Sequence, residues 1–219
     1  MLKAVILTDS NALSQFEFNA LIPLISPEKQ KRIKQFNFFR DAQNALLGDI
    51  LARAEICRAT ALSNKQLVFS TNEYGKPFLA NIPHINYNIS HAGSYVACAI
   101  DDNKAVGIDI EIIKPVDIKI AEQFFSADEA DYIKGNQQMQ RFFEIWTKKE
   151  SRIKWEGKGL SRPLPSFSVF DPTEKGRIVY HRVFHNHEAT CHICSASQGI
   201  PLVRVISTAE LLWQARTVL

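Results

Sequence analysis

Apolar and polar residues follow two spacings along this chain, and each spacing indicates a type of secondary structure. Short apolar or alternating runs predict strands both before and after residue 105. Helical spacing of apolar residues predicts two long helices, over residues 41–62 and 139–155. The expected strands are residues 2–7, 67–69, 85–93, 95–100, 106–111, 167–170, 177–184, 189–196 and 202–206.

Local end signals add shorter elements. Ser26 followed by Pro27 is typical of a helix start, and residues 126–129 form a capping box that starts another helix. Residues 72–77 have the composition of a turn. The tail, residues 207–219, is expected to be a weak helix or a docking strand.

The order of these elements is similar in the two parts of the chain. Each part has a long helix followed by short antiparallel strands, with a break near residues 101–106 and no repeat at the level of single residues. We therefore predict an α+β fold built as a pseudo-twofold pair of similar halves, residues 1–104 and 105–219. A cleft between similar halves is a common ligand site.

Composition narrows the class of protein. Apolar residues make up 46% of the 219 residues, which is enough for a core, and the formal charge of +3 is too mild to indicate a nucleic-acid partner. The N-terminus does not resemble a signal peptide, and no apolar run approaches the ~20 residues of a membrane span. The four cysteines show no disulfide framework. We expect a cytoplasmic protein with reduced thiols and no membrane partner.

Two stretches carry candidate chemistry. In the strand 106–111, alternation places Asp109 and Glu111 on the side opposite the apolar residues. In the helix 139–155, Glu150 and Lys154 are spaced i, i+4 and share one face. If the helix packs over the strand, three carboxylates converge beside one ammonium. Oxygen ligands of this kind favour a hard cation, Mg²⁺ above all, and phosphate-ester chemistry.

Other features allow more than one interpretation. The basic run from Lys29 to Lys34, which includes Arg32, is either a solvated helix face or a phosphate clamp. The pair Phe124-Phe125 is either core or an apolar patch for a partner helix. The residues between 185 and 194 include possible zinc ligands, but their spacing matches no standard four-ligand pattern and an ordinary strand is favoured.

Several motifs occur together and in a fixed order, and with them the chain resembles the Sfp-type 4'-phosphopantetheinyl transferases. The resemblance extends over roughly residues 24–170. The residues that carry it are Ser26-Pro27-Glu28-Lys29, Leu46-Leu47-Gly48-Asp49, Tyr74-Gly75-Lys76-Pro77, Asn88-Ile89-Ser90-His91, Gly107-Ile108-Asp109-Ile110-Glu111, Trp146, Lys149-Glu150-Ser151, Lys154 and Gly157-Lys158-Gly159-Leu160.

The resemblance implies an activity, a cofactor and partners. Such enzymes move the phosphopantetheine arm of coenzyme A to a serine of an apo acyl or peptidyl carrier protein, with Mg²⁺ (Mn²⁺ as an alternative) and release of 3',5'-ADP. Their fold is a pseudo-dimer with coenzyme A between the halves, and the chain length favours a type that acts as a monomer. It implies metal ligands at Asp109, Glu111 and Glu150. It implies coenzyme A contacts at Lys29, Arg32, Tyr74, Gly75, Lys76, Pro77, Ser90, His91, Asp109 and Lys154.

Roles in catalysis follow from the chemistry of a diphosphate. Lys154 would neutralise charge as the phosphorus–oxygen bond breaks, next to a bound cation. Glu150 is the candidate base for the serine hydroxyl, with Glu111 as the alternative. The family often carries a basic residue near position 44, where this chain has Asn44, with Arg40 as a substitute. Arg152 is expected at the surface.

Two further functions remain open at this point. One is a metal-dependent phosphoesterase that uses the same carboxylates to hydrolyse coenzyme A. The other is a non-catalytic module that binds coenzyme A or a carrier protein. The complete set of three acidic residues and Lys154 argues against the second.

Overall fold

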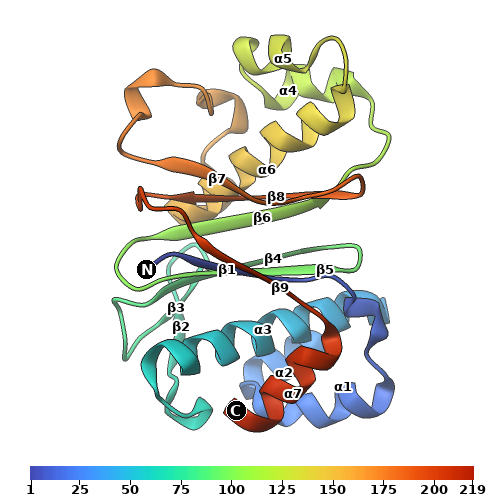
Figure 1. The fold of residues 1–219 in the computed structure, drawn as a ribbon, viewed down its shortest axis with the longest axis vertical. Helices are drawn as coiled ribbons and strands as arrows, with labels where there is room; N and C mark the ends of the chain where they lie inside the picture. Colours follow the sequence, from blue (N-terminus) through green and yellow to red (C-terminus); the bar gives the residue numbers. More distant parts are fainter.

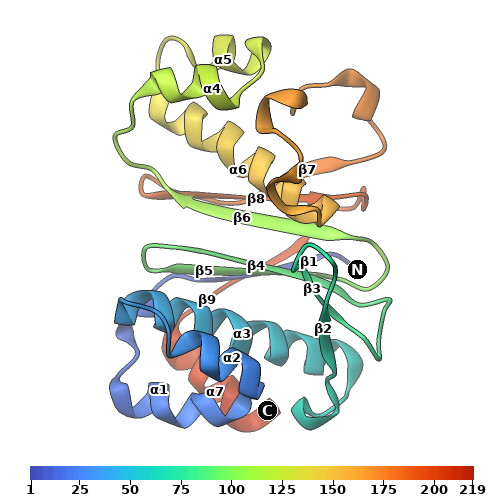
Figure 2. The same cartoon turned by 180° about the vertical axis from the view of Figure 1, so that it is seen from behind.

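Two β-sheets lie face to face between two groups of helices (Figure 1). The computed structural model describes the backbone of residues 1–219 and all side chains except those of residues 11 and 160. Leu160, which ends one of the motifs above, is therefore outside the described side chains. Viewed from behind, the same four layers are seen, with the two sheets in the middle (Figure 2).

The first sheet has the strand order β4-β5-β1-β9. Its strands are β1 (Lys3–Leu7), β4 (Asn86–Ala92), β5 (Tyr95–Asp101) and β9 (Leu202–Ile206). Helix α3 (Phe39–Thr60) lies on its outer face, and α1 (Gln15–Leu21), α2 (Pro27–Ile33) and α7 (Thr208–Val218) pack against α3 (Figure 1). A separate small hairpin pairs β2 (Phe69–Thr71) with β3 (Pro77–Leu79).

The second sheet has the strand order β6-β8-β7. Its strands are β6 (Val106–Ile112), β7 (Val179–His185) and β8 (Ala189–Ser195). Helix α6 (Gln138–Glu156) lies on the outer face of this sheet, and α4 (Ala121–Phe124) and α5 (Ala127–Ile133) lie beyond α6 (Figure 1). None of the helices that the structure describes is both long and apolar enough to cross a membrane.

The chain order and the sheet order repeat between the halves. The first half runs β1, α3, β4, β5 with sheet order β4-β5-β1, and the second runs β6, α6, β7, β8 with sheet order β7-β8-β6. Every strand pair within these two sets is antiparallel. The predicted α+β fold with two similar halves is confirmed, and α3 corresponds to α6 just as β4 corresponds to β7.

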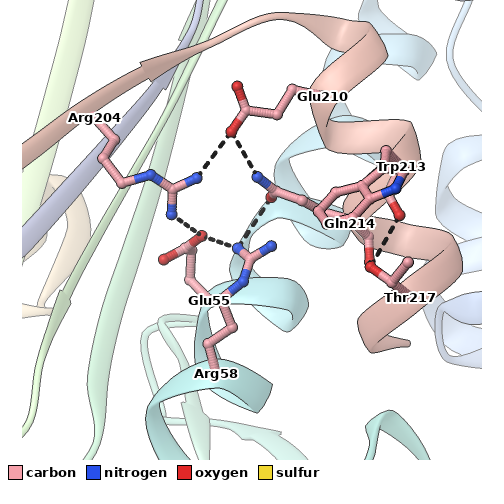
Figure 3. Close-up of polar contacts among 7 residues, drawn as sticks. All are labelled: Glu55, Arg58, Arg204, Glu210, Trp213, Gln214 and Thr217. Carbon is pink, nitrogen blue, oxygen red and sulfur yellow. Dashed lines mark hydrogen bonds and ion pairs between the residues drawn. The ribbon is translucent and has the colours of Figure 1, made fainter.

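The C-terminal segment breaks this correspondence, because it returns to the first half. Strand β9 pairs in parallel with β1, and α7 packs on α3. Figure 3 shows a closed ring of polar contacts that holds it there. The ring consists of Glu55, Arg204, Glu210, Gln214 and Arg58. Residues 202–219 are expected in the second half, residues 105–219, but in the structure they pack with the first half.

The two sheets meet through small and aliphatic side chains. Ala97 and Ala99 of β5 face Ile108 and Ile110 of β6 in one buried cluster. Small residues on one side let the sheets pack closely without cavities. Beside this contact, the side chain of Asn88 on β4 accepts a hydrogen bond from the backbone N–H of Ile108 at 2.9 Å. Strand β4 thus satisfies part of the free edge of β6 with a side chain instead of its backbone.

Most of the predicted helix starts are present, and some local expectations are wrong. Ser26 caps α2 with Pro27 in its first turn, and a capping box opens α5 at Ser126. The expected strand over residues 167–170 is absent from the described backbone, which has a loop there. Arg152 is buried, where it pairs with a glutamate in the next turn of α6, so its expected surface position is wrong.

Two further ambiguities are resolved. Phe125 is buried and Phe124 packs edge-on against Trp146, so this pair belongs to the core between α4 and α6. Of the possible zinc ligands, Cys191 faces the core between the sheets, while the His192 ring contacts Thr147 of α6. The four cysteines are free and buried. The interpretation of residues 189–195 as an ordinary strand is confirmed.

Candidate active site

Helix α6 lies directly on β6 because residue 107 has no side chain. A Cβ atom at Gly107 would lie 2.0 Å from the carbonyl oxygen of Ser151 and 2.3 Å from the amide nitrogen of Trp155, both in the backbone of α6. Side chains cannot be accommodated at such distances in a packed interior. The close approach places Glu150 and Lys154 over the polar face of β6.

A hydrogen-bonded cluster joins the two halves at this point. Nζ of Lys154 donates to Oδ1 of Asp109 at 2.7 Å and to Oγ of Ser90 at 2.9 Å. The Ser90 hydroxyl donates to the same carboxylate oxygen at 2.9 Å. The side chain of Asp109 is 5% exposed, so its charge depends on the ammonium of Lys154 for compensation. The expected approach of Lys154 to Asp109 is confirmed.

Two carboxylates beside this cluster are left without partners. Glu111 and Glu150 are half-buried, and neither makes a hydrogen bond or ion pair with a described side chain. Burial, followed by the charge of Asp109, raises the pKa of Glu111 to about 7. The same two causes raise the pKa of Glu150. The charges of Asp109 and Lys154 therefore act on both glutamates.

The carboxylates here are ligands of the type that a divalent cation prefers, but they are not gathered into a metal site. Oδ2 of Asp109 is buried and accepts no hydrogen bond, although buried carboxylate oxygens are nearly always satisfied. Among the described side chains, no three His, Cys, Asp or Glu residues lie together in a group that could hold a metal ion. A hard cation would draw on Asp109 Oδ2 and on the unpartnered carboxylates of Glu111 and Glu150, and its charge would relieve their mutual repulsion.

The turn between β2 and β3 lies against the C-terminal end of α6 (Figure 2). Nζ of Lys76 donates to three backbone carbonyls, those of Val106 at 3.1 Å, Lys154 at 2.6 Å and Trp155 at 3.3 Å. Burial lowers the pKa of Lys76 to about 8. All three ammonium donors are therefore occupied in bridging the halves. A direct contact of this ammonium with a ligand, as the resemblance implies, would have to replace one of these bonds.

The other residues of this turn are placed differently. Tyr74 is 48% exposed, and its hydroxyl has no described partner. Gly75 has φ +83°, a backbone conformation that side chains rarely adopt, and so it shapes the turn. Pro77 faces inward and lines the cavity next to α2. The turn thus contributes one wall of that cavity through Pro77.

A cavity of about 250 Å³ lies between α2, α3 and β4. Lys29, Arg32 and His91 line it together, and the first two also line an adjoining cavity of about 380 Å³. Burial, followed by the charge of Lys154, lowers the pKa of His91. Two fixed positive charges next to a hydrogen-bonding ring suit a phosphate group. Asn88, which accepts the hydrogen bond from Ile108 of β6, also lines this cavity, whereas Ser90, Asp109 and Lys154 do not.

Two asparagines position the site, and the sequence interpretation did not assign them these roles. Asn88 holds the edge of β6 in place, as described above. Asn44 is buried and donates to the carbonyl of Gly93 at 3.0 Å while accepting from Ser10 at 2.6 Å. Asn44 therefore ties α3 to the β4–β5 hairpin instead of reaching a ligand. The buried polar character of both residues is visible only once the fold is known.

Comparison with known proteins agrees with this geometry in both halves. Residues 12–103 match the family model described as 4'-phosphopantetheinyl transferase, N-terminal. Residues 105–209 match the model of the 4'-phosphopantetheinyl transferase superfamily. The boundary between the two matches falls in the turn that leads into β6.

Individual relatives cover most of the chain. The 4'-phosphopantetheinyl transferase Sfp of Bacillus subtilis is 45% identical over 160 residues, which are 72% of this chain and 71% of the relative. The 4'-phosphopantetheinyl transferase psf-1 of Bacillus pumilus is 42% identical over 188 residues, 84% of this chain and 78% of the relative. An L-aminoadipate-semialdehyde dehydrogenase-phosphopantetheinyl transferase of Pongo abelii is 32% identical over 167 residues, 69% of this chain and 54% of the relative. With this identity and coverage, and with both halves matched, the chain belongs to the 4'-phosphopantetheinyl transferase superfamily and is an enzyme of the Sfp type.

Proposed function

We propose that this enzyme transfers the 4'-phosphopantetheine arm of coenzyme A to a serine hydroxyl of an apo acyl or peptidyl carrier protein, with release of 3',5'-ADP. One observation carries the proposal. The Lys154–Asp109 pair, with two unpartnered carboxylates beside it, is hydrogen-bonded to Ser90 of β4, and the same strand lines a cavity together with Lys29 and Arg32. Coenzyme A has phosphates suited to both places, a diphosphate and a 3'-phosphate.

Residues of the first half bind and orient the nucleotide end. Lys29 and Arg32 pair with the 3'-phosphate, and His91 donates a hydrogen bond to it. Pro77 closes one side of the cavity without adding a charge. These contacts fix the coenzyme so that its diphosphate lies at the junction, near Ser90. Binding energy from the remote end thereby orients the reacting phosphorus.

Residues of the second half carry the chemistry. Asp109, Glu111 and Glu150 would hold Mg²⁺ or Mn²⁺, which when bound would neutralise diphosphate charge as the phosphorus–oxygen bond breaks. Lys154 adds a fixed positive charge to the same region. Glu150, or alternatively Glu111, accepts the proton of the serine hydroxyl. Both are half-buried and unpartnered, as a proton acceptor at this place requires.

The direct test is incubation with coenzyme A, Mg²⁺ and an apo carrier protein, followed by mass spectrometry of the carrier. We expect the carrier to gain the mass of the arm, and 3',5'-ADP to appear in equal amount. No gain with several acyl and peptidyl carriers would contradict the proposal. Omitting Mg²⁺ with a chelator present is the control for the cation.

The same assay distinguishes the transferase from the two alternative functions. Release of 3',5'-ADP without any carrier would indicate a phosphoesterase, and tight coenzyme A binding without turnover would indicate a non-catalytic module. To identify the base, Glu150→Gln and Glu111→Gln are compared at saturating Mg²⁺. The variant that keeps coenzyme A binding but loses turnover by about 100-fold or more identifies the base. We further propose that the enzyme acts as a monomer in the cytoplasm, and size-exclusion chromatography with light scattering tests its oligomeric state.

A further inference from the structure

A second polar cavity lies over β7 and β8, and one of its lining residues, Thr190, is the cross-strand neighbour of Glu111 on β6. It has a volume of about 530 Å³, roughly twice that of the cavity lined by Lys29 and Arg32. The N-terminal turns of α6 form one wall, and the β7–β8 hairpin forms the other. Its chemically notable lining residues are Tyr132, Arg141, Glu144, Arg182, His185 and Thr190. None of them has a part in the transfer reaction proposed above.

The pseudo-twofold relation gives this cavity a counterpart. The first cavity lies between α3 and the hairpin end of β4, with His91 near the end of that strand. The second lies between α6 and the hairpin end of β7, where His185 is the last residue of the strand. Because α6 corresponds to α3 and β7 to β4, the two cavities occupy equivalent places in the two halves.

The side chains around the second cavity include positive groups that are not fully paired with other protein groups. Glu144 is already paired with Lys148 at 2.6 Å and accepts a hydrogen bond from the Tyr132 hydroxyl at 3.0 Å. Arg182, in contrast, has no hydrogen bond or ion pair with any described residue. Arg141 uses one of its terminal nitrogens to bind backbone carbonyls, so part of its donor capacity remains. The site therefore has donors and positive charge for an anion.

The lining of the cavity includes a hydroxyl group that lacks a partner. Thr190 is 1% exposed, and its Oγ1 atom makes no hydrogen bond with any described group. A buried hydroxyl without a partner costs about 1–3 kcal/mol, so native structures rarely keep one without a use. Valine has the same shape and would avoid this cost. The hydroxyl therefore indicates a ligand that supplies the missing partner.

We propose that this cavity is a second oxyanion site, which binds a small molecule bearing a phosphate or carboxylate group. The Arg182 guanidinium pairs with the anion, and the Thr190 hydroxyl donates a hydrogen bond to it. His185 lies at the mouth and contacts the bound molecule. The proposed ligand is not a reactant of the transfer reaction, and the test needs neither coenzyme A nor a carrier protein.

The experiment titrates the protein with inorganic phosphate, and in a parallel arm with malonate, at constant ionic strength. The histidine ring signals are followed by NMR, with His185 assigned from a His185→Gln variant and His91 serving as the reporter of the first cavity. We expect a saturable shift of the His185 signal, with a dissociation constant on the order of 1 mM or tighter for the better anion. The arm that saturates first identifies the anion class.

Three variants make the result specific. Arg182→Gln should weaken the anion effect at His185 about tenfold or more and leave the effect at His91 unchanged. Arg177→Gln is the matched control, because Arg177 is exposed on the approach to β7 and does not line the cavity. Thr190→Val should also weaken binding while it leaves the unfolding temperature equal or higher.

Two outcomes of the titration would overturn the proposal. One is no saturable shift of His185 with either anion at concentrations well above 1 mM. The other is a shift that Arg182→Gln and Arg177→Gln reduce equally, since that indicates only general screening. Loss of stability in Thr190→Val would also count against it, because it would mean that the hydroxyl already has a partner within the protein.

Discussion

The buried Lys149–Glu129 ion pair leads to a quantitative prediction about the helix that carries Glu150. Both side chains are 0% exposed, and their charged atoms lie 2.8 Å apart. Lys149 also donates to the carbonyls of Leu164 at 2.8 Å and Phe167 at 2.6 Å, so its three donors are all used. Replacing it with methionine, Lys149→Met, keeps an apolar chain of similar length and removes only the charge and the donors.

The expected loss of unfolding free energy follows from the contacts that Glu129 keeps and loses in this variant. Glu129 keeps two backbone donors, from Ser126 at 2.8 Å and Val169 at 2.7 Å, but loses its only described counter-charge. The buried carbonyl of Leu164 and the partly buried carbonyl of Phe167 lose their donor as well. Breaking a buried pair on one side costs about 3–5 kcal/mol of unfolding free energy. For a chain of this size, that corresponds to a fall of about 6–20 °C in the unfolding temperature.

Urea unfolding followed by circular dichroism measures this cost. The matched control is Lys148→Met, which removes the neighbouring lysine of α6. That lysine pairs with Glu144 at 2.6 Å in a place where both side chains keep some exposure, 16% and 23%, so we expect a loss of about 1 kcal/mol or less. The double variant Lys149→Met/Glu129→Gln should recover part of the loss, because no unpaired charge stays buried.

Activity separates the roles of the two neighbours Lys149 and Glu150. Lys149 lies on the side of α6 that faces α5, away from Asp109. Below its unfolding temperature, Lys149→Met should therefore keep transfer activity within a few-fold of the parent. Equal stability losses in Lys148→Met and Lys149→Met would refute the reasoning. So would a folded Lys149→Met protein without activity.

Three further predictions concern the site and its support. Gly107→Ala should lower the unfolding free energy by more than about 3 kcal/mol in urea titrations, because its Cβ would meet the backbone oxygen of Ser151 at 2.0 Å. Asp109→Asn should abolish the rise in unfolding temperature that Mg²⁺ or Mn²⁺ gives the parent, and a full rise in this variant would rule out the metal site. Burial holds the pKa of His192 well below 6.5, so the unfolded chain binds a proton that the folded one does not. Stability should then fall by up to about 1.4 kcal/mol per pH unit as pH drops below ~6.5, and His192→Asn should flatten this slope.

Much of the site could be predicted because it depends on local periodicity. The period of a strand places Asp109 and Glu111 on one side, and the period of a helix places Glu150 and Lys154 together. Both facts hold wherever these elements pack. Their mutual approach requires Gly107, and its role becomes visible only when α6 is seated on β6. The metal site itself stays a prediction.

Features that depend on distant partners could not be predicted. Residues 167–170 alternate like a strand, but side chains occupy the backbone groups that a strand would pair: Lys149 binds the carbonyl of Phe167 and Glu129 binds the amide of Val169. Arg152 is buried because Glu156 and the distant Glu174 compensate its charge. Nothing in the five residues of β9 indicates that they pair with β1. In each case the deciding contact is remote in sequence.

Both halves contribute residues to the candidate site, and Ser90 forms hydrogen bonds across the junction between them. The first half contributes Lys29 and Arg32, which line a cavity, and the second half contributes the acidic residues. Ser90 of β4 contacts both Asp109 and Lys154, and Asn88 two residues earlier holds the edge of β6. A shift of one half against the other would therefore break the contacts of Asp109 Oδ1 and move the unsatisfied Oδ2. The position of the proposed metal ligand is thus set by the contact between the halves.

Variants at Ser90 should therefore alter cation affinity even though Ser90 is not a metal ligand. Ser90→Ala should weaken Mn²⁺ binding by about three- to tenfold, because one hydrogen bond to a charged group is lost. Mn²⁺ affinity is measured by paramagnetic relaxation, and an unchanged affinity would show that Asp109 is positioned by β6 alone.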